Sequence, residues 1–412
     1  MKIIRLISRI ITGLVFIFSG FVKAIDPLGS AYKIHDYFQA FHISFLQFLC
    51  LPLAIIMFTG EFIAGFSVLT GFRQKTGRWL VFLLMLFFTP LTLILAIFNP
   101  VSDCGCFGDA INLTNWQTFG KNIILLVFVL FLFTERKKVL PVFKPVTEWT
   151  IVGIVALLFI LFSFFNLRFL PVIDFLPYSI GTNIESKMKI PDGSVADQYS
   201  TTFIYEKAGV RKEFSINDYP SGDTAWKFID QKSVLIKKGY ETPIHDLSVI
   251  NLNNENITGE ILNNKGYILL MISGKLSETD HKKLIRGFDL GKYCVTGNTG
   301  FYILTASGNS EVKSYGEGLP FCYTDETVLK TMIRSNPGYI LLRDGTIVGK
   351  WSWANVPDKV WFSNDMTGKQ LELFSQHNAV FFVIILFTAL SIFLLLACLL
   401  LREKRSNITQ IT

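Results

Sequence analysis

Charged residues are scarce in this sequence, and several common catalytic motifs are absent from it. Only 17% of the 412 residues are charged and half are hydrophobic, whereas soluble globular domains carry about 25% charged residues. There is no phosphate-binding loop, no dinucleotide-binding fingerprint and no nucleophile elbow. These absences argue against nucleotide-dependent enzymes and serine hydrolases, and the composition indicates a membrane protein.

Histidine is also rare, and none of the five histidines has the spacing of a metal site. The net charge of +7 comes from basic residues that flank the apolar segments. The sequence also contains no internal repeat and no low-complexity tract. We therefore expect neither a resident metal nor a nucleic-acid partner.

Six apolar segments approach or exceed the roughly 20 residues that a helix needs to cross a bilayer. They are residues 4–22, 45–69, 79–99, 116–134, 149–168 and 379–401. The first segment also has the form of a secretory signal peptide, because Lys2, Arg5 and Arg9 precede its apolar core. No Ala-x-Ala cleavage site follows it, however, and further apolar segments come soon after. The sequence thus predicts six membrane-spanning helices.

The distribution of basic residues predicts the orientation of these helices. Lysine and arginine concentrate before the first span, between the second and third, after the fourth, and after the sixth. The positive-inside rule places these regions in the cytoplasm. We expect a lipid-embedded, multi-pass protein of the bacterial inner membrane with both termini cytoplasmic. Residues 100–115 and 171–378 would then lie in the periplasm.

The spans divide the chain into seven predicted parts, and short connections between the first four favour an antiparallel four-helix bundle. The parts are a membrane bundle (1–137), a cytoplasmic linker (138–148), a fifth span (149–168), a strand-rich periplasmic lead-in (171–260), an α/β domain (262–365), a sixth span (379–401) and a basic cytoplasmic tail (402–412). The predicted fold class is an α-helical membrane protein, a four-helix bundle plus two further spans, with an α/β domain outside the membrane.

The α/β domain resembles the thioredoxin-like family in the order of its predicted elements. Apolar runs at 267–273 and 301–306 predict buried strands, each followed by a helix, and Asp344-Gly345 predicts the turn of a closing hairpin. Pro337 stands before that hairpin, where the family has a cis-proline. The Cys-x-x-Cys that the family carries after the first strand is missing. The resemblance implies a thioredoxin-like scaffold without its dithiol.

Two of the six cysteines lie in the segment DCGCFGD, residues 103–109, which we call the thiol loop. It follows the third span on the oxidising side of the membrane, where cysteines can pair. The glycine between the cysteines relaxes the backbone enough to close a bridge, which would be strained and easily reduced. We expect Cys104 and Cys106 to form an exchanging dithiol/disulfide pair. The alternatives are unreactive thiols in a packed turn and an incomplete soft-metal site.

Glu61 is the one acid deep inside an apolar segment, and intramembrane acids are functional candidates by default. It either relays protons beside a quinone, which is a candidate cofactor, or makes a structural hydrogen bond to another helix. The secondary thiols are Cys50, which can meet the loop pair, and Cys294 and Cys322, which can pair with each other. Cys322 also precedes a predicted helix start, where the dipole lowers a thiol pKa. The simpler interpretation of all three is packing or structural.

The N-terminal third resembles the DoxX-like membrane proteins and, within them, the methylamine-utilisation family MauE. The residues that carry the resemblance, which covers about residues 1–137, are Arg9, Gly13, Phe18, Ser19, Gly20, Lys23, Asp26, Glu61, Gly65 and the thiol loop. The resemblance implies a role in forming or keeping disulfides in proteins outside the cytoplasm, with Cys104 and Cys106 as the site residues.

These observations predict an inner-membrane thiol–disulfide redox protein that acts in the maturation of periplasmic proteins. Its partner would be a periplasmic protein that presents thiols or a disulfide. The alternative is a non-enzymatic assembly protein whose cysteine-free thioredoxin-like domain binds partners. A transporter is a weaker alternative, because a single intramembrane acid offers little of a substrate path.

Overall fold

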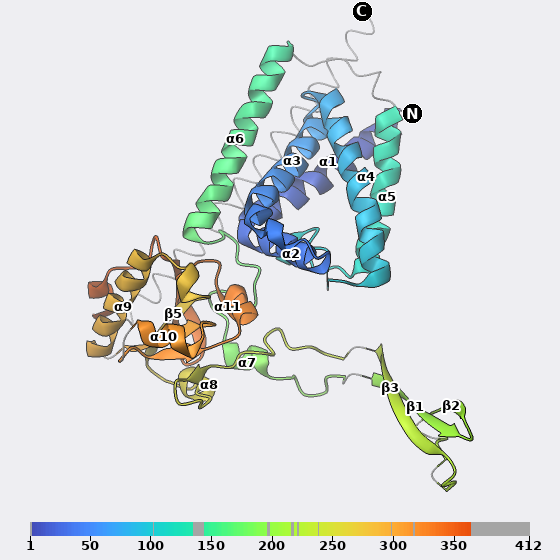
Figure 1. The fold of residues 1–412 in the computed structure, drawn as a ribbon. Helices are drawn as coiled ribbons and strands as arrows, with labels where there is room; N and C mark the ends of the chain where they lie inside the picture. Colours follow the sequence, from blue (N-terminus) through green and yellow to red (C-terminus); the bar gives the residue numbers. More distant parts are fainter. Residues whose placement is uncertain are drawn as a thin grey trace, which may run out of the picture. The chain divides into compact units, whose positions relative to one another are not determined.

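The computed structural model describes residues 2–101, 103–134, 144–195, 198–215, 218–220, 222–237, 239–297, 299–315 and 318–363 (Figure 1). The predicted sixth span, the basic tail and most of the predicted cytoplasmic linker lie outside these residues. The chain divides into two compact units, one formed by Met1–Gly181 with Ser248–Thr412 and the other by Thr182–Leu247.

Five helices in the described part of the chain are long and apolar enough to cross a membrane. They are α1 (Lys2–Ile25), α3 (Cys50–Thr70, preceded by the 3-10 helix η1, Ser44–Leu49), α4 (Gln74–Phe98), α5 (Asn115–Thr134) and α6 (Pro145–Phe169). Each coincides with one of the first five predicted segments, which confirms that this region suits a membrane protein. The shorter helix α2 (Pro27–Ala40) follows α1 and begins where the Asp26 side chain accepts a hydrogen bond from the Gly29 N–H.

Helices α1 and α3 pack closely because glycines lie at their contact. A Cβ atom on Gly20 would lie 2.7 Å from the Phe58 carbonyl oxygen, and one on Gly65 would lie 2.7 Å from the Ile17 nitrogen. Small residues allow this backbone approach between membrane helices. Apolar side chains from α1, α3, α4 and α5 fill the space between these helices: Phe16, Ala64, Val68, Val81, Met85, Leu125, Val129 and Leu132.

Residues 248–363 form an α/β region around a six-stranded sheet of order β4-β7-β6-β5-β8-β9. The strands are β4 (Ile250–Asn251), β5 (Tyr267–Ser273), β6 (Gly300–Thr305), β7 (Phe321–Tyr323), β8 (Gly338–Arg343) and β9 (Thr346–Ser352). The helices are α8 (Thr258–Leu262), α9 (His281–Thr296), α10 (Asn309–Ser314) and α11 (Glu326–Met332). Strand β5 pairs in parallel with β6 and antiparallel with β8. The Asn336–Pro337 peptide bond before β8 is cis.

The local sequence explains where the helices of this region begin and why β8 and β9 form a hairpin. The Asp280 side chain caps α9 by accepting hydrogen bonds from two backbone N–H groups, and Asp325 caps α11 in the same way. Asp344 and Gly345 both have positive φ in the turn between β8 and β9, as the sequence predicts for an Asp-Gly hairpin. The sheet and its helices enclose an apolar core that includes Leu269, Ile303 and Leu341.

The second unit contains a small antiparallel sheet of order β2-β1-β3. Its strands are β1 (Gln198–Lys207), β2 (Val210–Ser215) and β3 (Lys227–Lys237), and the short helix α7 (Ile184–Met188) precedes them. Edge-to-face aromatic contacts join the strands, with the ring centroids of Tyr205 on β1 and Phe214 on β2 5.8 Å apart. This sheet falls within the segment that we predicted to be strand-rich.

Candidate functional site

The thiol loop connects α4 to α5 and turns its two cysteines toward each other. The Cys104 and Cys106 sulfur atoms lie 2.6 Å apart, and both cysteines are free and partly exposed. Gly105 between them has a φ of +62°, in the left-handed region that glycine adopts without strain. The Asp103 carboxylate accepts a hydrogen bond of 2.9 Å from the Gly105 N–H and so stabilises this turn. The local sequence thus explains why the two sulfur atoms meet.

The two thiols differ strongly in acidity. A hydrogen bond from the Cys104 thiol lowers the pKa of Cys106 to about 6, and the charges of Lys121 and Lys23 add to this effect against the opposing effect of burial. The same hydrogen bond, together with burial, raises the pKa of Cys104. At neutral pH the pair is therefore a Cys106 thiolate beside a Cys104 thiol. The thiolate is the nucleophilic form, so the pair has the asymmetry that thiol–disulfide exchange requires.

Side chains from α1 and α2 hold the loop backbone in place. The Ser19 hydroxyl lies 2.8 Å from the Cys106 carbonyl oxygen, and the Tyr37 hydroxyl donates a hydrogen bond of 2.6 Å to the Cys104 carbonyl. The Lys33 ammonium pairs with Asp103 at 2.7 Å. Both cysteine carbonyls therefore lie within hydrogen-bond distance of hydroxyls from outside the loop, and these contacts restrain the loop backbone.

The Phe107 ring anchors the loop on α1 and α5. It makes an edge-to-face contact with Phe18, with ring centroids 5.4 Å apart, and the Lys121 ammonium lies 4.2 Å from its centroid. This cation–π contact holds the Lys121 charge beside the loop, where it favours the Cys106 thiolate.

A buried ion pair lies beside the thiol loop. The Lys23 ammonium contacts both Glu61 carboxylate oxygens, at 2.7 and 2.9 Å, and Glu61 is only 3% exposed. The Ser19 hydroxyl lies 2.8 Å from a Glu61 oxygen as well as from the Cys106 carbonyl. A hydroxyl has one proton to donate, so these two acceptors compete for it. The Ser19 hydroxyl therefore connects Glu61 to the backbone of the thiol loop.

A cavity of about 40 Å³ lies among Ser19, Lys23, Glu61, Cys106 and Lys121. A space of this size is sufficient for an ordered water molecule, and Ser19, Lys23 and Glu61 in its lining are possible hydrogen-bond partners for it. The ion pair and the acidic thiol therefore line the same small cavity.

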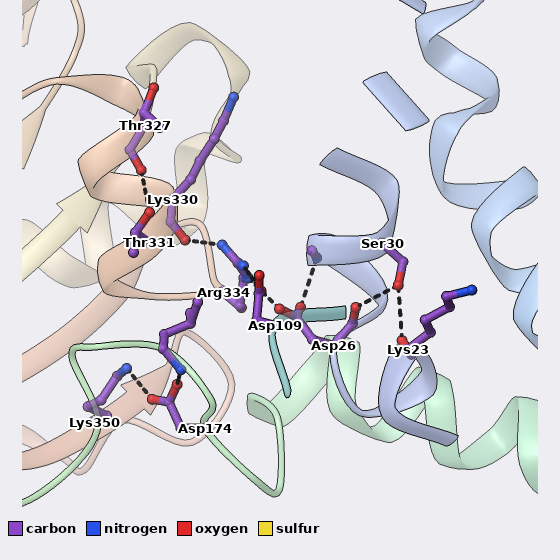
Figure 2. Close-up of polar contacts among 12 residues, drawn as sticks. Lys23, Asp26, Ser30, Asp109, Asp174, Thr327, Lys330, Thr331, Arg334 and Lys350 are labelled. Carbon is purple, nitrogen blue, oxygen red and sulfur yellow. Dashed lines mark hydrogen bonds and ion pairs between the residues drawn. The ribbon is translucent and has the colours of Figure 1, made fainter. Parts of the chain in front are cut away.

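Arg334, which follows α11 in the α/β region, contacts both ends of this site (Figure 2). Its Nε lies 2.7 Å from an oxygen of Asp26, the residue that caps α2, and its Nη2 lies 2.9 Å from an oxygen of Asp109, the last residue of the thiol loop. Its Nη1 donates to the Lys330 carbonyl. The Arg334 side chain is 8% exposed, so its charge is buried together with that of Asp26, whereas Asp109 is partly exposed. Arg334 thereby ties the α/β region to the thiol loop.

A second buried ion pair ties the α/β region to the segment that follows α6. The Lys350 ammonium on β9 lies 2.5 Å from an Asp174 oxygen (Figure 2). It also donates to the Tyr178 carbonyl at 3.0 Å. The α/β region is therefore joined through buried charges to two different segments of the helical part of its unit.

The other thiols lie away from this cluster. Cys50 is the first residue of α3 and packs in an apolar core with Ala31, Ile34 and Ala54. Cys294 and Cys322 are both buried and free, and burial raises the pKa of each to about 12. The expectation that a nearby helix start makes Cys322 acidic is wrong, because this residue lies in β7 inside the sheet.

The sequence analysis singled out Cys104, Cys106 and Glu61, and the structure places them within one connected cluster. It did not identify Tyr37, Lys121 or Arg334 as part of the site. Lys121 lies within the first two turns of α5, close in sequence to the thiol loop, and its position could have indicated that it lies near the cysteines. Nothing in the sequence around Tyr37 or Arg334 indicates their contacts with the loop. Within the described ranges, no group of three or more His, Cys, Asp or Glu side chains is placed to hold a metal ion.

Comparison with known proteins matched two parts of the chain. A family model described as "Methylamine utilisation protein MauE" matches residues 1–135, and one described as "Domain of unknown function (DUF8463)" matches residues 199–238. Neither the curated proteins nor the solved structures gave a match. The first match spans α1 to α5 together with the thiol loop, and it confirms the predicted resemblance of this part to MauE. The N-terminal third of the chain is therefore similar to the methylamine utilisation protein MauE.

Proposed function

We propose that this protein is a membrane thiol–disulfide redox protein that acts on proteins outside the cytoplasm. The observation that carries the proposal is the Cys104/Cys106 pair, whose sulfur atoms lie 2.6 Å apart and of which Cys106 has a pKa of about 6. The similarity of residues 1–135 to MauE supports the same function, because that resemblance implies disulfide maturation. Glu61 and Lys23 would serve as the proton-handling groups beneath the pair.

In the proposed reaction, a thiolate of the partner attacks the Cys104 sulfur of an oxidised loop pair. A mixed disulfide forms and Cys106 leaves as the thiolate, the better leaving group because its pKa is lower. A second thiolate of the partner then attacks the mixed disulfide and releases Cys104. The partner's two thiols have become a disulfide, the loop pair has gained both electrons, and one proton returns to Cys104. Lys121 and Lys23 stabilise the charge that develops on Cys106.

The proposed topology follows the predicted one. Helices α1, α3, α4 and α5 would form a DoxX-like four-helix bundle in the bacterial inner membrane, with the N-terminus in the cytoplasm and the thiol loop in the periplasm. The α/β region would be a thioredoxin-like periplasmic domain. The sheet order β6-β5-β8-β9, with one parallel and two antiparallel pairings, supports this assignment. The segment between β5 and α9 has no cysteine, and α9 is capped by Asp280. The loop pair would therefore supply the thiols that this domain lacks.

Thiol trapping in intact cells tests the proposal. We expect Cys104 and Cys106 to change between dithiol and disulfide when the medium is switched from reducing to oxidising. We expect Cys106→Ala, which keeps Cys104 and removes the cysteine that can resolve a mixed disulfide, to accumulate a mixed disulfide with a partner. Cys50→Ala is the matched control, because this thiol is buried away from the loop and should leave the trapping pattern unchanged. A loop pair that stays in one redox state in both media would rule the proposal out.

A second candidate is a non-enzymatic assembly protein, favoured by one observation. The described cysteines of the α/β region, Cys294 and Cys322, are buried with raised pKa values, so this region presents a surface but no reactive thiol. The double substitution Cys104→Ser with Cys106→Ser distinguishes the two candidates. Full function at normal abundance would favour the assembly protein, and loss of function at normal abundance would favour the redox protein.

A further inference from the structure

A larger cavity reaches the thiol pair from the side of the spanning helices. It has a volume of about 490 Å³ and is lined by α2, α3, α4 and the thiol loop. This volume lies within the range of small-molecule sites, roughly 300–1,000 Å³. The polar and sulfur-containing residues of its lining include Lys23, Lys33, Tyr37, Cys104 and Cys106. A molecule bound against these residues would meet both sulfur atoms.

The remainder of the cavity is apolar and opens on the outer surface of the helices. Phe38, Met57 and Leu91 line its interior, and its wall includes Ile56 and Phe87, which are 68% and 63% exposed. Ile56 lies on α3 and Phe87 on α4, both long and apolar enough to span a membrane. In the proposed topology this opening faces lipid, so a ligand would enter from the bilayer and would itself be apolar along most of its length.

We propose that this cavity binds a quinone, with its ring at the thiol end and its apolar tail along α3 and α4, and that the quinone reoxidises the reduced loop pair. The occupant has to enter from lipid and to accept two electrons from a dithiol. A quinone meets both requirements, whereas the acyl chain of a phospholipid meets only the first. The inference rests on the proposed function, and it supplies the electron acceptor that repeated turnover of the loop pair requires.

Electrons and protons balance in the proposed step. The Cys104 and Cys106 sulfur atoms join in a disulfide bond and give up two electrons, and the quinone takes up these electrons with two protons to become a quinol. One proton comes from the Cys104 thiol. The second comes from the Lys23 ammonium, which lines both this cavity and the small cavity beside Glu61. Lys23 regains a proton from solvent before the next turnover. The Lys23 charge also stabilises the negative charge that develops on the quinone oxygen.

Two matched substitutions on α4 test the site. Leu91 lines the cavity, and Leu91→Trp would fill part of it; Leu86, on the same helix and 57% exposed, is not among the lining residues, so Leu86→Trp adds the same bulk outside. Full-length protein in lipid nanodiscs is reduced, freed of reductant and mixed with decylubiquinone. We expect one quinol for each loop dithiol lost in the wild type and in Leu86→Trp. We expect a rate lower by about tenfold or more in Leu91→Trp, because the bulky ring displaces the ligand.

A parallel measurement separates failure of the inference from failure of the proposed function. Exchange of the wild-type loop pair with glutathione disulfide requires no quinone. Exchange without quinol formation would overturn the inference and leave the proposed function standing, and the absence of both would overturn both. Equal rates in Leu91→Trp and Leu86→Trp would show that quinone reaches the thiols by another route. Met57→Trp on α3 replaces Leu91→Trp if the latter does not fold, with the same expected loss.

Discussion

Replacing Cys104 tests whether its hydrogen bond is what makes Cys106 acidic. The pKa of Cys106 is lowered from 9.0 to about 6, first by the hydrogen bond from Cys104 and then by the charges of Lys121 and Lys23. Cys104→Ala removes the donor, whereas Cys104→Ser keeps an O–H donor in nearly the same place. We expect the pKa of Cys106 to rise toward 9.0 in the alanine variant and to stay low in the serine variant. Lys121→Gln should raise it by less than Cys104→Ala.

The magnitude of the change determines which readout is useful. At pH 7 a thiol with a pKa of about 6 is roughly 90% thiolate, and one with a pKa of about 9 is roughly 1% thiolate. The thiolate fraction therefore falls by up to about ninetyfold. A more basic thiolate is also more nucleophilic, by about fifteen- to thirtyfold over three pKa units for a Brønsted coefficient of about 0.4–0.5. The alkylation rate at pH 7 then falls only about three- to sixfold, so the midpoint of the pH–rate profile is the decisive quantity.

The assay is alkylation of the reduced, full-length protein by iodoacetamide over a range of pH. Mass spectrometry of the digested protein reports Cys106 separately from Cys50, Cys294 and Cys322. A midpoint near 6 in the wild type and in Cys104→Ser, with a higher midpoint in Cys104→Ala, is the expected result. An unchanged midpoint in Cys104→Ala would refute the reasoning, because the principal cause of the low pKa would have been removed without effect.

Three further substitutions test the packing, the buried ion pairs and the turn around the site. Gly65→Ala should lower the free energy of unfolding in detergent by about 1–3 kcal/mol through overpacking, while Gly60→Ala on the same helix should not, because a Cβ there meets nothing within 4 Å. Arg334→Gln leaves the buried Asp26 carboxylate and the partly exposed Asp109 carboxylate without their cation, and we expect a loss of about 3–5 kcal/mol, as for a broken buried ion pair. It should also speed hydrogen exchange in the thiol loop, and equal exchange in the control Lys330→Gln would contradict this. Gly105→Ala forces a left-handed conformation that costs about 1–2 kcal/mol, and should slow closure of the loop disulfide by air oxidation; an unchanged closure rate would show that the turn relaxes freely.

The parts of the structure that depend on local sequence could be predicted. Five long apolar helices, the Asp-capped helices of the α/β region and the Asp344-Gly345 hairpin all follow from apolar run length, capping residues and turn residues near in sequence. The closeness of the two loop sulfur atoms is equally local, since they are separated only by Gly105. The predicted sixth span and the tail stay predictions, because they lie outside the residues that the structure describes.

The parts of the site that depend on distant contacts could not be predicted. Arg334 pairs with Asp26 across a sequence separation of 308 residues, and no periodicity or motif connects the two. The error for Cys322 has a related cause. Its sequence position before a helix start predicts a lowered pKa, but its position in β7 buries it, and the cost of burying a thiolate exceeds the effect of the helix.

Residues outside the thiol loop hold it in place, and this has a consequence for protein engineering. The backbone of the loop is held by Ser19 and Tyr37, its aromatic residue by Lys121, and its last carboxylate by Arg334. A DCGCFGD peptide grafted onto another helical bundle would bring the two cysteines but none of these contacts. The grafted peptide would therefore keep the two sulfur atoms close together. The direction of the thiols and the full acidity of Cys106 depend on the helices that surround the loop in this protein. A functional transplant would have to carry α1, α2, α5 and the end of α11 with it.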